Sequence, residues 1–178
     1  AALYLFEKSS AEVKEKQEEI ILGLKGILEE YQGLDALYIH SIFDSHKTHV
    51  AASICAIEAV RLLENSKKPK KIYGCELWRD LDWLPNDEKV VFDVSGNDEL
   101  SRNLMDCFAS QNAVKRYDLA SIARRVSNAT YYASHSGDTA NELIYAVDLT
   151  ELGFEGVSIA SFAQAKLKKF AREVLNNF

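Results

Sequence analysis

Three of the four histidines in this chain lie within ten residues of one another, at His40, His46 and His49. The last two are three positions apart, so they share one face of a helix that begins near His46. A neutral imidazole is a good zinc ligand, and an imidazole also transfers protons near neutral pH. The segment therefore predicts a metal site, a proton-transfer site or both. The alternative is an ordinary helix start at which the imidazoles only pack.

The elements that would position these histidines are a strand before them and a helix after them. Residues 34–39 form a short apolar run that predicts a buried strand. Residues 48–64 carry small apolar side chains at helical spacing and predict a helix that packs closely on a sheet. The loop 40–47 would then lie at the carboxyl end of a strand, where functional side chains collect in α/β sheets.

Helices and strands alternate along the rest of the chain, which predicts an α/β layered fold with a partly parallel sheet. Ser9 and Glu12 fit a capping box at the start of the first helix. The absence of a repeat or a linker predicts one domain over residues 1–178. Further helices are expected at 11–32, 97–111, 119–133 and 160–176, and further strands at 71–76, 89–94 and 143–149.

Composition excludes several functional classes. The chain has 21 Lys and Arg against 27 Asp and Glu, a net charge of −6, which does not favour nucleic-acid binding. No apolar run approaches the roughly 20 residues that span a bilayer, so no membrane span is expected. Three cysteines without a CxxC pair predict reduced thiols in a cytoplasmic protein. Neither a glycine-rich nucleotide motif nor a nucleophile elbow occurs.

Residues 44–52 read Asp-Ser-His-Lys-Thr-His-Val-Ala-Ala and follow Ala-Leu-Tyr-Ile-His at 36–40. This segment resembles the second conserved block of the PIG-L/LmbE-like zinc-dependent de-N-acetylases, which commonly reads Asp-x-His-Pro-Asp-His before a helix of small residues. Lys47 and Thr48 stand where the common form has proline and aspartate. The resemblance extends over most of the chain and continues at 76–84, 108–111, 115–118 and 133–135.

The resemblance implies a Rossmann-like fold, a Zn²⁺ cofactor and removal of an N-acetyl group from an amino-sugar conjugate. By position, His49 would be a zinc ligand. His46 would be the catalytic companion histidine, which assists proton transfer or polarises the tetrahedral intermediate. Asp44 would orient an imidazole at the catalytic site.

Two further side chains are candidate substrate-binding residues. Arg79 lies between aromatic and acidic residues in a predicted loop, where a guanidinium could bind a sugar or an anionic substituent. The alternative is a loop held only by its own tryptophans. His135 precedes a glycine turn and could approach the substrate, the alternative being a capped helix end.

The family's N-terminal His-Pro-Asp-Asp block, which supplies two zinc ligands and the general base, has no counterpart in this sequence. The match supplies one ligand, whereas a catalytic zinc takes three from the protein. We therefore expect the carboxyl-terminal portion of a deacetylase domain without its first strands, inactive alone and completed by an N-terminal portion or a fused domain. Zinc is expected in the complete domain and should be bound weakly or not at all by this chain alone. Such a chain should expose a sheet edge that another chain, or a second copy in a homo-oligomer, covers. The alternative is a non-catalytic sugar-binding or assembly module of the same fold.

Overall fold

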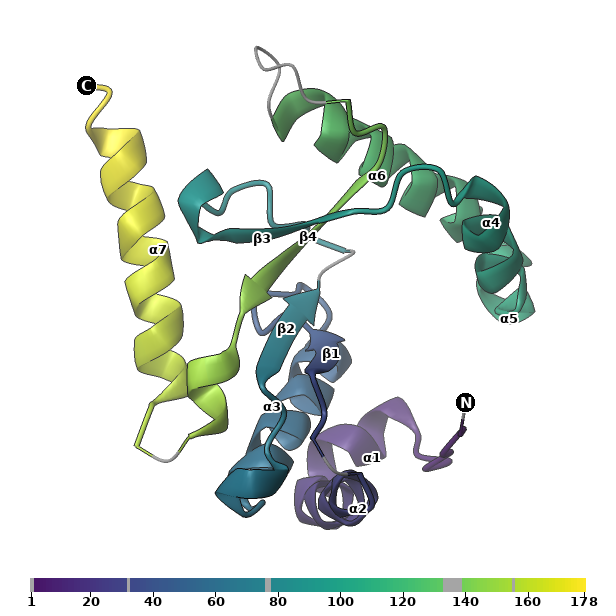
Figure 1. Cartoon of the computed structure of the whole chain (residues 1–178), viewed down its shortest axis with the longest axis vertical. Helices are drawn as coiled ribbons and strands as arrows, with labels where there is room; N and C mark the ends of the chain where they lie inside the picture. The colour runs from purple at the N-terminus through teal and green to yellow at the C-terminus, as the bar shows by residue number, and fades with distance from the viewer. Residues whose placement is uncertain (1, 32, 76–77, 133–138, 155) are drawn as a thin grey trace. The chain divides into compact units, whose positions relative to one another are not determined.

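The computed structural model describes residues 2–31, 33–75, 78–132, 139–154 and 156–178 (Figure 1). Its helices are α1 (Ser10–Glu15), α2 (Gln17–Glu29), α3 (Lys47–Arg61), α4 (Asp98–Asp106), α5 (Ala109–Asn112), α6 (Tyr117–Tyr132) and α7 (Ile159–Leu175). Its strands are β1 (Ala36–His40), β2 (Lys71–Cys75), β3 (Lys89–Asp93) and β4 (Leu143–Asp148), in the sheet order β1-β2-β4-β3. Short 3-10 turns are η1 (Asn65–Lys67), η2 (Asn86–Glu88) and η3 (Thr150–Gly153).

The sheet is mixed, which confirms the predicted α/β class with a partly parallel, Rossmann-like layered arrangement. β1 and β2 run parallel, with His40 opposite Cys75 at their carboxyl ends. β4 runs antiparallel to β2, with Val147 opposite Gly74. Functional side chains that follow β1 therefore lie where the parallel pair ends.

By its internal contacts the chain divides into two compact units, Ala1–Glu88 with Ala146–Phe178, and Lys89–Tyr145. A compact unit need not fold independently, so the single domain over 1–178 stays a prediction. All three clustered histidines belong to the first unit.

β1 lies at the edge of the sheet, and no strand among the described residues pairs with its outer side. The strand expected at 34–39 is present, but the expectation that it is buried is wrong. Tyr38 is 60% exposed, His40 is also exposed, and the other three side chains of β1 are half-buried. An edge strand has one neighbour instead of two, and the identity of a strand's neighbours is not encoded locally in its sequence.

Small side chains bring α3 close to the neighbouring elements. Ala51, Ala56 and Ala59 are buried along this helix, which contacts both β1 and α2. The Ser53 hydroxyl donates to the His40 carbonyl oxygen at 2.6 Å and ties α3 directly to the end of β1. The helix expected at 48–64 is therefore confirmed, with slightly different ends.

The capping box predicted at Ser9 is present. The Ser9 hydroxyl accepts from the Glu12 backbone N–H, and the Glu12 carboxylate accepts from the Ser9 backbone N–H. The expected single helix at 11–32 is instead two helices, because Lys16 adopts φ −110° and ψ 43° between α1 and α2. No glycine or proline marks this break in the sequence.

Arg61 connects the last turn of α3 to a segment far along the chain. Its Nε donates to the Leu152 carbonyl oxygen at 2.7 Å, and its Nη2 donates to the Val157 carbonyl oxygen at 2.5 Å. Nη1 also pairs with Glu58 one turn earlier at 2.8 Å. The helix that carries the histidines is thus held at its far end by residues of η3 and the segment that follows it.

The second unit contains β3 and the helices α4, α5 and α6. Arg125 on α6 donates to the Ser101 hydroxyl on α4 at 2.9 Å. The Tyr145 hydroxyl donates to the Asn128 carbonyl oxygen at 2.9 Å and joins the start of β4 to α6. The single helix expected at 97–111 is divided into α4 and α5.

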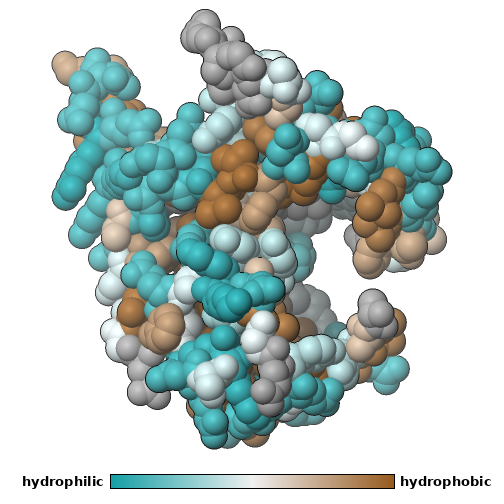
Figure 2. Space-filling model, viewed as in Figure 1, coloured by the Kyte–Doolittle hydropathy of each residue, from teal (hydrophilic) through white to brown (hydrophobic). Residues whose placement is uncertain are grey.

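The terminal helix α7 belongs to the first unit, and Phe162 is its buried side chain. Figure 2 shows mainly hydrophilic side chains over the carboxyl-terminal part of this helix. Lys166 and Lys169 pair with Glu88 and so attach the helix to η2. Among the described residues, no helix combines the length and the apolar character needed to cross a lipid bilayer.

Gly74 in β2 is packed too closely for a larger residue. A Cβ atom at this position would lie 2.6 Å from Leu149 Cδ1 and 3.1 Å from Val147 Cγ1. We expect Gly74→Ala to lower the free energy of unfolding by about 1–3 kcal/mol, because overpacking displaces neighbouring side chains. Gly26→Ala is the matched control, because no atom lies within 4 Å of its Cβ position, and it should stabilise α2 by about 0.5–1 kcal/mol. Urea unfolding measures both variants, and equal stabilities would contradict the prediction.

Candidate metal centre

The three clustered histidines are positioned by a strand end and a helix start. His40 is the last residue of β1, and His46 is the N-cap residue of α3. In the loop between them, Asp44 Oδ1 accepts from the His46 backbone N–H at 2.8 Å and fixes the first turn of the helix. His49 follows within that first turn. The local sequence therefore brings the end of β1 and the start of α3 to one place.

His40, Asp44 and His49 form the candidate metal cluster. One ligand atom from each lies within 4.8 Å of the others. The side chain of Asp44 is fully buried, whereas that of His49 is 25% exposed, so solvent reaches this imidazole. Imidazole nitrogens are donors that zinc accepts, so His40 and His49 are the candidate ligands, and Asp44 is placed to orient His49.

The hydrogen bond between Asp44 and His49 fixes which nitrogen of His49 is available. His49 Nδ1 lies 2.8 Å from Asp44 Oδ2. An ionised carboxylate can only accept, so Nδ1 carries the proton and donates it. The other ring nitrogen, Nε2, then keeps its lone pair for a metal. Carboxylates orient ligating histidines in this way in known zinc sites.

His40 stacks on the ring of His49, with ring centroids 4.0 Å apart and an angle of 6° between the planes. Burial lowers the pKa of His40, and the neighbouring His49 lowers it further. The imidazole is therefore neutral at physiological pH, which is the form that binds metals. Sequence reasoning did not place His40 among the site residues. Its position as the last residue of a strand before a loop was the signal that could have identified it.

His46 lies beside the cluster and is exposed. Its ring centroid is 4.5 Å from that of His49, at an angle of 38°. On its other side it stacks with Trp78, at 6.1 Å and 25°. The structure therefore brings together Asp44, His46 and His49, the three residues predicted for catalysis and metal binding. Their chemical roles stay predictions.

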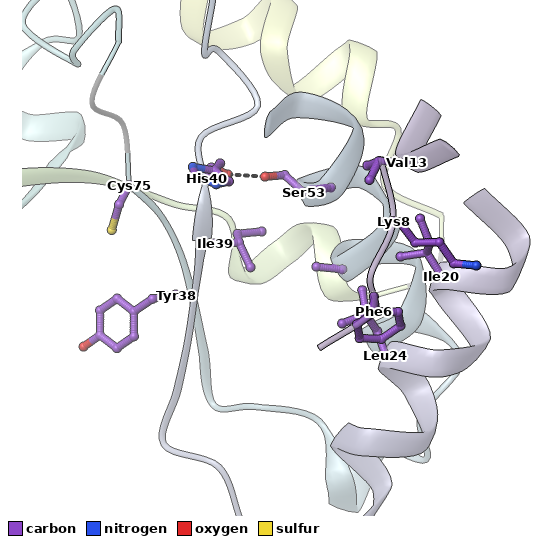
Figure 3. Close-up of a pocket in the computed structure, with 12 residues that line it drawn as sticks. Phe6, Lys8, Val13, Ile20, Leu24, Tyr38, Ile39, His40, Ser53 and Cys75 are labelled. Carbon is purple, nitrogen blue, oxygen red and sulfur yellow. Dashed lines mark hydrogen bonds between the residues drawn. The ribbon is translucent and has the colours of Figure 1, made fainter. Parts of the chain in front are cut away.

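A pocket of about 550 Å³ adjoins His40 on the side of β1 that faces the helices (Figure 3). Cys75 also lines it, and burial raises the pKa of this thiol to about 11, so it is protonated at neutral pH. Ser53 lines it as well, with its hydroxyl bonded to the His40 carbonyl oxygen. The rest of the lining is mainly apolar and comes from the N-terminal segment, α1, α2, β1 and α3: Phe6, Val13, Ile20, Leu24, Ile39 and Ala56.

Comparison with known proteins adds one structural likeness. Neither a family model nor a curated protein matches the sequence. The structure is similar to the crystal structure of GalB, the 4-carboxy-2-hydroxymuconate hydratase from Pseudomonas putida KT2440, with a TM-score of 0.52 and 16% sequence identity. The match covers 79% of this chain and 60% of the hydratase chain. At this identity it shows a shared fold alone, and this chain spans about 60% of that protein's length.

Of the two predicted substrate-binding residues, the structure describes Arg79. Arg79 is exposed and directly follows Trp78, whose ring stacks with that of His46. His135 lies outside the described residues. Thr48, which stands where the resembling family has an aspartate, shares a hydrogen bond with Ser10 at 2.5 Å. Substrate binding by Arg79 and His135 remains a prediction from the sequence.

Proposed function

We propose that this chain is part of a zinc-dependent hydrolase that removes the N-acetyl group from an amino-sugar conjugate. The observation that carries the proposal is the hydrogen bond from His49 Nδ1 to Asp44 Oδ2, which leaves His49 Nε2 as a metal ligand. His40 stacks on this ring and offers a second neutral imidazole, which has to turn out of the near-parallel stack before both rings can bind one ion. When bound, zinc supplies the Lewis acidity that makes an amide open to attack by water. The substrate class rests on the resemblance of residues 44–52 to the de-N-acetylases.

One carboxylate positions both histidines of the HxxH pair. Asp44 Oδ1 holds the backbone of His46, and Asp44 Oδ2 holds the ring of His49. His46 is exposed beside His49, where it can meet a substrate. We assign to His46 the transfer of a proton to the departing amine nitrogen, a step for which imidazole is suited near neutral pH.

The site needs more protein ligands than the described residues offer. With Asp44 bonded to His49, the cluster supplies two imidazole nitrogens, whereas catalytic zinc sites use three protein ligands and an open position. No strand in the described part of the chain pairs with the outer edge of β1, and His40 lies at the carboxyl end of this strand. A strand added parallel to β1 would end beside His40. We propose that a segment from outside these 178 residues pairs there and supplies the remaining ligands.

The apolar pocket along β1 supports this arrangement, because it could receive side chains of the added strand (Figure 3). Ile39 of β1 faces it together with Leu24 of α2 and Ala56 of α3. We place the activity in the cytoplasm, where the three free thiols, Cys55, Cys75 and Cys107, would remain reduced.

The test compares the 178-residue chain with the complete product of its gene, which the proposal requires to be longer. Both are incubated with methyl N-acetyl-β-glucosaminide, and the released amine and acetate are measured. We expect only the longer product to hydrolyse the substrate. A chelator should abolish this activity, and added zinc should restore it. Hydrolysis by the 178-residue chain alone, or an inactive zinc-loaded longer product, would overturn the proposal. An inactive product that still binds the sugar would identify a non-catalytic binding module.

A further inference from the structure

The two tryptophans of the loop between β2 and η2 have different surroundings. Trp83 is half-buried, and its ring meets Phe43 at 5.1 Å and Phe170 at 5.8 Å, both edge-on. Trp78 is 46% exposed, and its ring lies alongside His46. Trp83 therefore anchors the loop to α7 and to the segment after β1, whereas Trp78 presents a large aromatic surface to solvent next to the candidate centre.

Trp78 is close enough to the metal cluster to contact the same small molecule. Its ring centroid is 6.1 Å from that of His46, which is 4.5 Å from that of His49. A molecule that lies on the indole can thus reach across His46 toward His49. Nearly half of this side chain is open, so covering it with a ligand removes apolar surface from water.

The chemistry of an indole face selects the kind of ligand. The face of an aromatic ring is electronegative, and its edge is electropositive. One face of a pyranose ring presents several C–H groups that are apolar and slightly positive, whereas its hydroxyl groups point outward around the rim. Such a ring can lie flat on an indole and keep its polar groups free for hydrogen bonds.

We propose that Trp78 is the stacking platform for the pyranose ring of the substrate and directs its acetamido group past His46 toward His49. This inference rests on the proposed function for its substrate class. Trp78 is a positioning residue, because it holds the sugar and takes no part in proton transfer. Trp83 has no such role, since its ring is packed between Phe43 and Phe170.

The two indoles report separately on ligand binding. In the ¹⁵N-labelled chain, each tryptophan gives one indole N–H resonance, and the variants Trp78→Phe and Trp83→Phe assign them. On titration with methyl N-acetyl-β-glucosaminide, the Trp78 resonance should shift and saturate, whereas that of Trp83 should stay in place. Trp78→Ala should weaken binding about tenfold, and Trp78→Phe should recover most of it, because an aromatic face is restored. If both resonances shift in parallel, or if neither shifts, Trp78 is not the residue on which the pyranose ring stacks.

Kinetics of the longer gene product separate this inference from the proposed function. Trp78→Ala should raise KM with little change in kcat, whereas His46→Ala should lower kcat. If the longer product is a zinc-dependent hydrolase and Trp78→Ala leaves its KM unchanged, the role of Trp78 is disproved and the proposed function is retained. If the Trp78 resonance shifts and saturates but the longer product has no hydrolase activity, the proposed function is disproved and sugar binding by Trp78 is retained.

Discussion

Replacing His49 by alanine is expected to lower the zinc affinity of the chain about 100-fold or more, because the variant loses the imidazole nitrogen that Asp44 orients toward the metal. Competition with a chromophoric chelator measures this affinity on the complete gene product, because the 178-residue chain supplies too few ligands to bind zinc tightly. Circular dichroism establishes that the variant is folded. The variant should also lose about 1–3 kcal/mol of stability, because the buried Asp44 carboxylate loses one of its two hydrogen bonds, so its zinc affinity is measured where it is still fully folded.

His46→Ala is the matched control for this measurement. Its ring is only 4.5 Å from that of His49 and is also an imidazole, but it lies outside the group of three that could share an ion. Zinc affinity should therefore remain close to that of the unmodified chain. The assignment of ligands is wrong if His46→Ala loses as much affinity as His49→Ala, or if His49→Ala retains the metal.

Asp44→Ala is expected to lower the free energy of unfolding by about 2–4 kcal/mol, because one buried carboxylate accepts two hydrogen bonds that involve a charged group. The change removes the acceptor that fixes the first turn of α3 and releases the ring of His49. Zinc affinity should also fall, by about 10–100-fold, as for other carboxylates that orient a ligating histidine. Urea unfolding and chelator competition measure the two effects separately.

Asp44→Asn distinguishes the two functions of this side chain. An asparagine keeps an oxygen that can accept from the His46 backbone N–H, so much of the stability should return. With the oxygen facing His46, the NH2 group of the asparagine faces His49 Nδ1 and cannot accept a hydrogen bond from it, so zinc affinity should remain low. Full recovery of both properties, or unchanged stability in Asp44→Ala, would contradict the role given to this carboxylate.

Features encoded by neighbouring residues could be predicted from the sequence. The capping box at Ser9 depends on Glu12 three positions later, and the structure has both of its hydrogen bonds. The proximity of His46 and His49 follows from their spacing at a helix start. The alternation of helices and strands likewise indicated an α/β sheet. In each case the information lies within one turn of helix or one strand.

Features that depend on distant partners could not be predicted in this way. The exposure of β1 depends on which strands flank it, and the stacking of His40 on His49 depends on how closely α3 approaches that strand.

The three bonds made by Arg61 have a consequence for the order in which the protein matures during synthesis. The helix that carries His49 is complete when its arginine emerges from the ribosome, but the carbonyl groups of Leu152 and Val157 that bind this arginine are made about ninety residues later. Until then the guanidinium remains solvated, and the last turn of α3 lacks its anchor. The helix that carries His49 therefore reaches its final form only after residue 157 has been made, and a nascent chain that stops before this residue lacks the anchor of α3.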